Sequence, residues 1–135
     1  MTSRLNPYLT FNGNAREAME FYHSVLGGEL KVNTFGEFGT PDPGIKDKVM
    51  HAQLTTSDGN TLMASDVPPG MDFAPGNTMT VSLSGAPGDN LQDTWSKLAD
   101  GATIAVPLEK QMWGDEFGQL VDRFGVPWMV NIGQQ

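Results

Sequence analysis

The chain has few side chains suited to acid–base chemistry, and the most suggestive one stands beside a repeated segment. Residues 53–63 (QLTTSDGNTLM) and 119–129 (QLVDRFGVPWM) share Gln, Leu, Gly and Met at an offset of 119 − 53 = 66. His51 lies just before the first copy. Alternate residues of a strand point to the same face, so His51 and Gln53 are expected on one face of a strand.

His51 is the candidate catalytic residue, because histidine titrates near neutral pH and can act as a general base. Tyr8 or Asp66 would be its partner, although no second catalytic group stands out in the sequence. The alternative is a structural histidine whose ring is satisfied by partners within the fold. The sequence leaves both interpretations open.

Composition narrows the classes of function. Sixteen acidic residues against eight basic ones give a net charge of −8, which disfavours nucleic acid and anionic membranes as partners. The absence of cysteine excludes disulfides, thiolate nucleophiles and cysteine metal sites. The N-terminal segment does not resemble a signal peptide, and no stretch reaches the roughly 20 apolar residues of a membrane helix. We therefore expect a cytoplasmic protein.

The first half of the chain predicts the order β-α-β-β-β. Residues 8–11 (YLTF) alternate as a strand does, and Asn14 with Glu17 has the capping-box pattern of a helix start. Apolar residues then recur at helical spacing until a Gly-Gly pair ends the helix. Three strands follow, and a Ser-Asp-Gly turn separates the last two.

The second half repeats this order. Residues 78–83 (TMTVSL) predict a strand, Asp89 is the expected cap of the next helix, and three strands follow. The first strands match at an offset of 83 − 11 = 72. Prolines and glycines mark residues 67–77 as a linker. The predicted organisation is a first module at 1–66 and a second at 78–135, together forming a single compact domain.

Several segments resemble the vicinal oxygen chelate superfamily, which has the glyoxalase / bleomycin resistance / extradiol dioxygenase fold. The helix end FYHSVLGG (21–28) is similar to a feature found widely in that superfamily. The segments MWGDEFG (112–118) and DRFGVPWMVN (122–131) resemble its PhnB-like branch more specifically. The resemblance implies an α+β fold of two βαβββ modules, each a curved mixed sheet with its helix outside, around a cleft. It also implies a homodimer.

Strand alternation predicts which side chains line that cleft, because the apolar face of each strand packs on its helix. A mixed polar, uncharged face suits a small-molecule site. The alternative is that these polar residues are merely solvated and that Met63 and Met129 only fill gaps. The predicted ligand-binding residues are Tyr8, His51, Gln53, Met63, Ser65, Trp113, Phe117, Gln119 and Met129.

Trp113 stands beside Gly114 in a charged turn, so it could be an aromatic lid with a glycine hinge. It could equally be a tryptophan packed at a strand end or in a dimer interface. Trp128, in contrast, is expected on the helix side, in the core.

Metal-dependent members of the superfamily bind one divalent ion with His, Glu or Gln side chains from the first and last strands of each module. The resemblance places Asn6, Met63, Thr78 and Met129 at those positions. Thioethers do not bind hard divalent ions, and a neutral amide and a hydroxyl are weak ligands. We therefore expect no metal and no other cofactor. A divalent metal would need a different set of ligands.

Three functional hypotheses follow. The leading one is a small-molecule binding protein that lacks the metal and takes an uncharged or cationic ligand. The second is a lyase, isomerase or dioxygenase-type enzyme that uses a divalent metal or His51 as base. The third is a module whose sheet face binds only protein partners.

Overall fold

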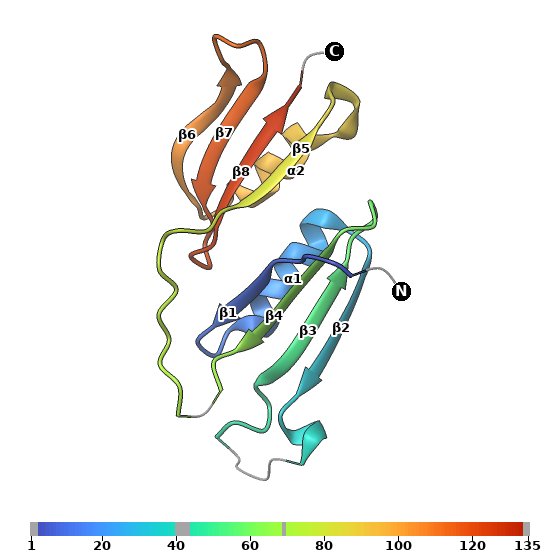
Figure 1. Cartoon of the computed structure of the whole chain (residues 1–135), viewed down its shortest axis with the longest axis vertical. Coiled ribbons are helices and arrows are strands. Elements are labelled where there is room, and N and C mark those ends of the chain that lie inside the picture. Colours follow the sequence, from blue (N-terminus) through green and yellow to red (C-terminus); the bar gives the residue numbers. More distant parts are fainter. Residues whose placement is uncertain (1–2, 40–43, 69, 134–135) are drawn as a thin grey trace. The chain divides into compact units, whose positions relative to one another are not determined.

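The structure is a computed structural model that describes residues 3–39, 44–68 and 70–133. The chain divides into two compact units, Met1–Pro75 and Gly76–Gln135 (Figure 1). Each unit is one βαβββ module, which confirms the predicted α+β fold. The boundary between the units, after Pro75, falls inside the segment 67–77 that was predicted as a linker. That the two modules form a single compact domain stays a prediction.

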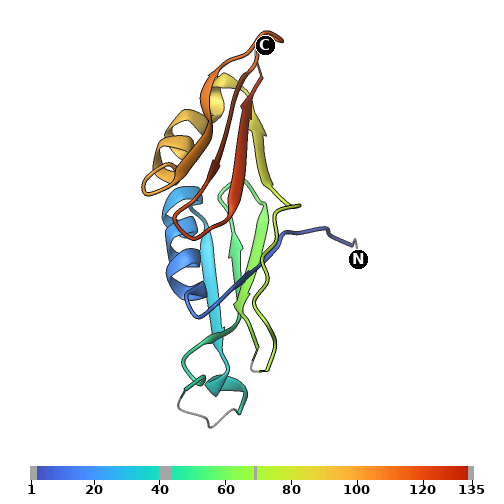
Figure 2. The same ribbon diagram turned by 90° about the vertical axis from the view of Figure 1, so that its left-hand side faces the viewer.

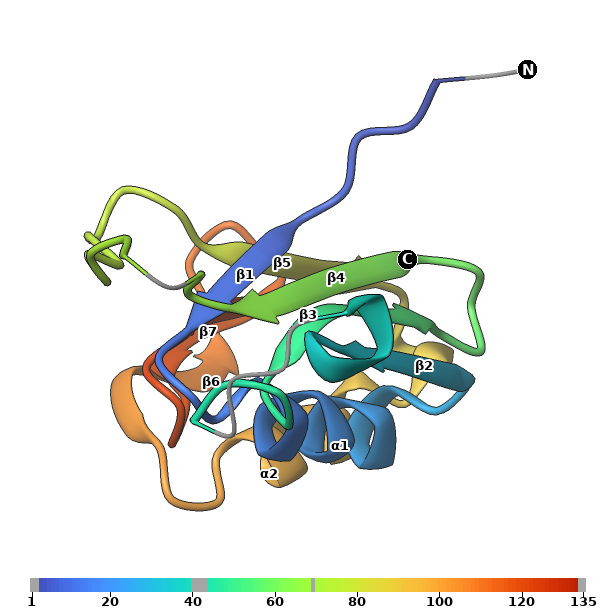
Figure 3. The ribbon, with the colours of Figure 1, turned by 90° about the horizontal axis from the view of Figure 1, so that it is seen from below.

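The first unit has a four-stranded mixed sheet with one helix on one of its faces (Figure 2). The strand order is β1-β4-β3-β2, with β1 and β4 parallel and the other pairs antiparallel. Figure 3 shows α1 beneath the strands of this sheet. The face opposite the helix is called the open face below. The elements are β1 (Tyr8–Phe11), α1 (Ala15–Leu26), β2 (Glu29–Thr34), the 3₁₀ turn η1 (Gly36–Phe38), β3 (Val49–Thr55) and β4 (Thr61–Asp66).

The second unit repeats this topology with a shorter helix. Its strand order is β5-β8-β7-β6, again with one parallel pair, β5 and β8. Within the described ranges, neither this helix nor any other is long and apolar enough to cross a membrane. The elements are β5 (Val81–Gly85), the 3₁₀ turn η2 (Pro87–Asp89), α2 (Leu91–Leu98), β6 (Thr103–Lys110), β7 (Glu116–Val121) and β8 (Pro127–Ile132).

The repeated sequence segment is a duplicated hairpin. Gln53 lies opposite Met63 across β3 and β4, and Gln119 lies opposite Met129 across β7 and β8. The same letters therefore occupy the same register in both units.

The turns of the two hairpins also match. The backbone N–H of Asn60 donates to Thr56 Oγ1 at 3.1 Å, and the N–H of Val126 donates to Asp122 Oδ1 at 3.0 Å. Thr56 and Asp122 are again 66 residues apart (122 − 56). Asp122 extends the pattern, because its second oxygen accepts the indole N–H of Trp128 at 2.8 Å. Trp128 is buried, as its position on the helix side predicts.

The core of each unit lies between its helix and the adjacent sheet face. Apolar side chains at helical spacing form one stripe of α1, which packs on alternate residues of β3 and β4. Leu54 and Ala64 are fully buried there, while their neighbours Gln53 and Met63 are half-buried on the open face. The buried residues of the stripe are Ala15, Ala18, Met19, Tyr22 and Val25.

Helix α1 begins differently from the prediction. The side chain of Asn14 makes no capping hydrogen bond. Asp66, at the end of β4, takes that role: its Oδ1 accepts the N–H groups of Gly13 and Ala15, both at 2.9 Å. Its Oδ2 accepts the N–H of Val49 at 2.8 Å. One buried carboxylate thus joins the helix N-terminus to two strands.

The start of the second unit is also shifted. The strand predicted at 78–83 runs from Val81 to Gly85, and Met79, which precedes it, is 79% exposed. Tyr8 of β1 pairs with Met63, and Ser82 of β5 pairs with Met129. The first strands of the two units therefore match at a sequence offset of 82 − 8 = 74, and the predicted offset of 72 is wrong.

The second helix also starts one residue later than predicted. The residue that precedes α2 is Asn90, in the left-handed conformation, and not Asp89. The Asp89 carboxylate instead accepts the backbone N–H of Ala86 at 2.7 Å.

Candidate functional site

The open face of the first sheet carries the polar residues that the sequence places there. Tyr8, Met63 and Gln53 form one row across β1, β4 and β3, as their register shows. Tyr8 is 51% exposed, and Met63 and Gln53 are half-buried. An aromatic ring, a thioether and an amide therefore form a surface with both apolar area and hydrogen-bonding groups.

His51 extends this row through its ring. The Tyr8 and His51 ring centroids are 6.0 Å apart and the ring planes are tilted by 47°. The imidazole is half-buried, and no hydrogen bond to it occurs within the described part of the chain. The contacts of His51 thus give no support to the interpretation of a ring satisfied by partners in the fold, and both ring nitrogens can reach a ligand.

Asp66 is not a candidate partner for His51. Its carboxylate is 3% exposed and both oxygens accept backbone N–H groups. It lies on the helix side of β4, whereas His51 lies on the open face. The sequence-based hypothesis of an acid–base pair with Asp66 is therefore wrong, because the carboxylate is committed to the start of the helix.

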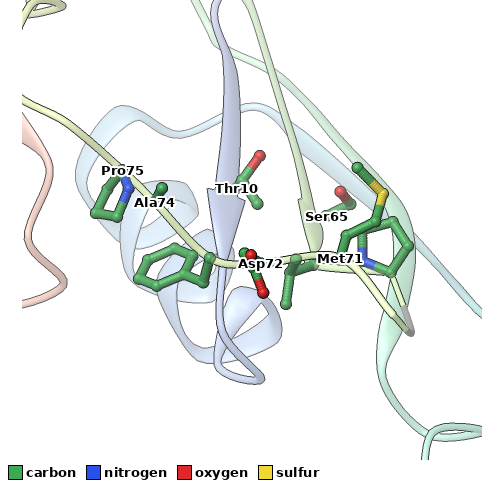
Figure 4. A pocket seen from close by; sticks show the side chains of 9 residues that line it. Thr10, Ser65, Met71, Asp72, Ala74 and Pro75 are labelled. Carbon is green, nitrogen blue, oxygen red and sulfur yellow. The ribbon is translucent and has the colours of Figure 1, made fainter.

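Ser65 lies under the segment that follows β4. Residues 67–68 and 70–75, called the strap below, run across the open face at Thr10 and Ser65 and border a cavity of about 230 Å³ that is open to solvent (Figure 4). The strap leaves β4 through the N–H of Val67, which donates to the carbonyl of Phe11 at 2.7 Å. Sequence reasoning assigned this segment to a linker and missed Met71, Asp72 and Phe73 as lining residues.

The open face of the second sheet carries the other predicted residues. Gln119 and Met129 are opposite each other across β7 and β8, with Ser82 next to Met129 on β5. Both side chains are half-buried, as are Gln53 and Met63 in the first unit. The two sheets thus present the same Gln–Met pair on their open faces.

Trp113 stands at the turn between β6 and β7 and contacts Phe117. The ring centroids are 6.1 Å apart in an edge-to-face arrangement, and Trp113 is 61% exposed. Gly114, which follows it, has φ = 102° and open space where a Cβ would lie. The exposed ring is available for contact with a ligand or a partner, and its role as a lid stays a prediction.

Carboxylates beside this turn are engaged by amides. Asp115 Oδ2 accepts from Asn131 Nδ2 at 3.0 Å, and both oxygens of Glu116 accept from Gln92 Nε2 at 3.1 Å. These acids therefore hold side chains in place at one end of β7 and β8, the central strands of the second sheet.

The predicted site residues fall on two units. Each unit gathers its own set on one face, and Ser65 lines the cavity under the strap. That the two sets serve one ligand stays a prediction. The set in the first unit is Tyr8, His51, Gln53, Met63 and Ser65, and that in the second is Trp113, Phe117, Gln119 and Met129.

The residues at the superfamily's metal positions do not suit a divalent ion. Met63 and Met129 offer thioethers on the open faces, and thioethers are poor ligands for hard cations. The register moves the counterpart of Asn6 from Thr78 to Thr80 (6 + 74), another neutral hydroxyl. No group of three His, Asp or Glu side chains suited to a metal occurs among the described residues.

Comparison with protein families gives one match along nearly the whole chain. The family model described as 3-demethylubiquinone-9 3-methyltransferase matches residues 3–131. The Escherichia coli protein YjdN is 29% identical over 147 residues, which cover 97% of this chain and 96% of YjdN. The Mycobacterium tuberculosis protein Rv0887c is 33% identical over 138 residues, which cover 96% of this chain and 73% of that protein.

Solved structures show the same fold. Protein PA1353 from Pseudomonas aeruginosa has a TM-score of 0.89 at 38% identity, covering 99% of this chain and all of that chain. A PhnB protein from Bacillus cereus, a putative 3-demethylubiquinone-9 3-methyltransferase, has a TM-score of 0.75 at 26% identity, covering 97% of this chain and 100% of that one. A glyoxylase/bleomycin resistance protein/dioxygenase domain from Frankia, at 16% identity and a TM-score of 0.67 over 98% of both chains, shares the fold alone.

Proposed function

This chain belongs to the PhnB-like family, whose model is described as 3-demethylubiquinone-9 3-methyltransferase, and we propose that it binds a small molecule on its open sheet faces without a divalent metal. The proposal concerns an uncharged or cationic organic ligand, since the chain carries a net charge of −8. Apolar area with a few convergent polar groups is the usual composition of such sites.

The observation that carries the proposal is the Tyr8–His51 pair. The two rings are in contact, and the imidazole has no hydrogen-bond partner within residues 3–39, 44–68 and 70–133. No fully buried side-chain nitrogen among the described residues lacks a partner, so the imidazole nitrogens of His51 are open to water and to a ligand. Gln53 and Met63 extend the same face with an amide and a polarisable thioether.

An enzyme that uses His51 as base is the second candidate. The free imidazole favours it as well, because a general base must reach the proton that it removes. Tyr8 is the one remaining partner from the sequence-based hypothesis, since Asp66 is committed to the helix. Lys31 lies opposite Gln53 on the same face, but among the described residues no hydrogen bond or ion pair joins His51 to an acid–base group, so binding is the function that the geometry supports better.

The methyl transfer to demethylubiquinone named in the family's description is not proposed for this chain. None of the sixteen glycines forms a Gly-x-Gly pair, so the glycine-rich nucleotide loops known from other cofactor-binding folds have no counterpart in the sequence.

Native mass spectrometry of protein purified without chelators tests the metal-free part of the proposal. We expect a dimer of about twice 14.6 kDa, with no stoichiometric divalent ion and with or without an organic adduct. The dimer is expected because both sheets have unpaired edge strands and Leu5, Met79 and Met112 are largely exposed. One divalent ion per protomer would overturn the metal-free proposal.

The cytoplasmic location and the lack of nucleic-acid binding also stay predictions.

Substituting His51 separates binding from catalysis. We expect His51→Ala to weaken binding of the copurified ligand about tenfold, the loss of one hydrogen bond and one ring contact. The measurement is a calorimetric titration of the ligand into both proteins. His23→Ala is the matched control, because His23 lies on α1 and its Nε2 contacts the carbonyl of Gly28 at 2.9 Å.

Two results would contradict this proposal. Equal affinities of wild type and His51→Ala would remove His51 from the binding surface. Complete loss of turnover of the same ligand in His51→Ala, with binding retained, would establish the enzyme instead.

A further inference from the structure

The cavity under the strap has features of a ligand site beyond the open face itself. Thr10 and Ser65 form its floor, and Met71, Asp72 and Phe73 belong to the strap above it (Figure 4). All of these residues lie in the first unit. The cavity is therefore formed within one unit by segments separated in sequence.

The hydroxyl of Ser65 has no partner within the described part of the protein and is open to solvent at the cavity. Ser65 is 8% exposed and lines the cavity, yet its side chain forms no hydrogen bond within the part of the chain that the structure describes. Thr10, opposite Ser65 in the β1–β4 register, also has no side-chain hydrogen bond there. Thr10 is exposed, and no fully buried side-chain oxygen of the described residues lacks a partner, so both hydroxyls are open to water and can accept from a ligand in the cavity.

The described residues that line the cavity carry only negative charge. Asp72 is the only charged residue among the described residues that line the cavity, and it forms no ion pair there. The chain's net charge of −8 adds to its effect, so a cation is favoured and an anion repelled. The remaining lining is largely apolar, with the Phe73 ring and the Met71 thioether exposed at 41% and 64%.

The size of the cavity limits what it can hold. Its volume of about 230 Å³ is below the roughly 300–1,000 Å³ typical of pockets for drug-sized molecules. It can therefore take a small molecule or one end of a larger one that continues along the open face.

We propose that this cavity binds the ammonium end of a small organic amine whose apolar body packs on the strap. The ammonium donates to the hydroxyl oxygens of Ser65 and Thr10, and the Asp72 carboxylate is its counter-ion. Phe73 and Met71 contact the apolar part, and the ring face of Phe73 also favours a cation. This inference rests on the proposed small-molecule function and specifies its ligand class.

Three probes of one shape test the charge preference: benzylammonium, benzyl alcohol and benzoate. Each is titrated into isotope-labelled full-length protein, and backbone amide shifts report the site. We expect benzylammonium to shift the amides of Thr10, Ser65 and Asp72 and to bind about two- to fivefold more tightly than benzyl alcohol, the value of a solvent-exposed ion pair. Benzoate should bind more weakly than benzyl alcohol, and added salt should reduce both differences.

Two variants assign the preference to its residues. Asp72→Asn should abolish the difference between benzylammonium and benzyl alcohol, whereas Asp58→Asn, the same charge change in the exposed hairpin turn, should preserve it. Ser65→Ala should weaken both probes a few-fold without lowering the thermal midpoint of the free protein. A purely structural serine would lower that midpoint instead.

The outcomes separate this inference from the proposed function. Shifts confined to Tyr8, His51 and Gln53, with the strap unaffected, would overturn the strap site and leave binding on the open face intact. A preference that survives Asp72→Asn, or the absence of binding by all three probes, would also overturn the inference. The proposed function is judged separately, by the copurified ligand and the His51 variant.

Discussion

Replacing Asp66 by alanine is expected to lower the free energy of unfolding by about 3–5 kcal/mol. The substitution leaves the N–H groups of Gly13, Ala15 and Val49 without their acceptor, and two of these three bonds are buried. An unpaired buried N–H costs about 1–3 kcal/mol. The loss of a negative charge at the N-terminus of α1 adds to this cost.

Thermal and urea unfolding measure this effect, with Asn14→Ala as the matched control. Asn14 immediately precedes α1 but its side chain makes no capping bond, so its removal should cost less than about 0.5 kcal/mol. For a chain of this length we expect Asp66→Ala to lower the melting temperature by about 10–15 °C. If Asn14→Ala destabilises the protein as much as Asp66→Ala does, the cap is local and the assignment of Asp66 is wrong.

This pair of residues also shows where inference from sequence ends. The helix itself is predictable, because its apolar stripe and its glycine end lie within a few residues of each other. The capping box at Asn14 and Glu17 is a local pattern of the same kind, yet the acceptor for Ala15 comes from Asp66, 51 residues away. A local pattern cannot identify a partner that only the β1–β4 pairing brings to the helix.

The hairpins and the first strands differ for a related reason. The hairpin repeat can be predicted from the sequence because its turn residues and its register depend on residues close together in the chain. Gln53 and Gln119 do take equivalent positions in the two hairpins. The sequence predicted an offset of 72 residues between the first strands, whereas the structure has 74. The position of β5 is set by its pairing with β8, which lies at the other end of the unit in sequence. Neighbouring residues therefore say little about where β5 begins.

The candidate site divides in the same way. Alternation along single strands predicts that Tyr8, His51 and Gln53 share the open face, and the structure places them there. The cavity at Ser65 could not be predicted, because prolines and glycines identify a loop without showing its path. Only the tertiary fold shows that Asp72 and its neighbours cross the sheet.

Replacing Gly28 by alanine is expected to destabilise the first unit by about 3 kcal/mol. Gly28 follows the end of α1 with φ = 91°, a conformation that costs an L-residue about 1–2 kcal/mol. A Cβ there would also overlap the backbone carbonyl of Thr55 and lie 2.7 Å from the Cα of Thr56. Backbone atoms at the end of β3 cannot move aside as a flexible side chain can, so the overlap adds about 1–3 kcal/mol.

Gly59→Ala separates the two contributions. Gly59 has φ = 86° in the turn between β3 and β4, and a Cβ there would meet no atom within 4 Å. Its substitution should therefore cost only the conformational part, about 1–2 kcal/mol. Urea unfolding of both variants gives the difference, which isolates the close approach of Gly28 to the end of β3. Equal losses would mean that the helix end and β3 are not packed this closely, and that the Gly-Gly pair serves only to end the helix.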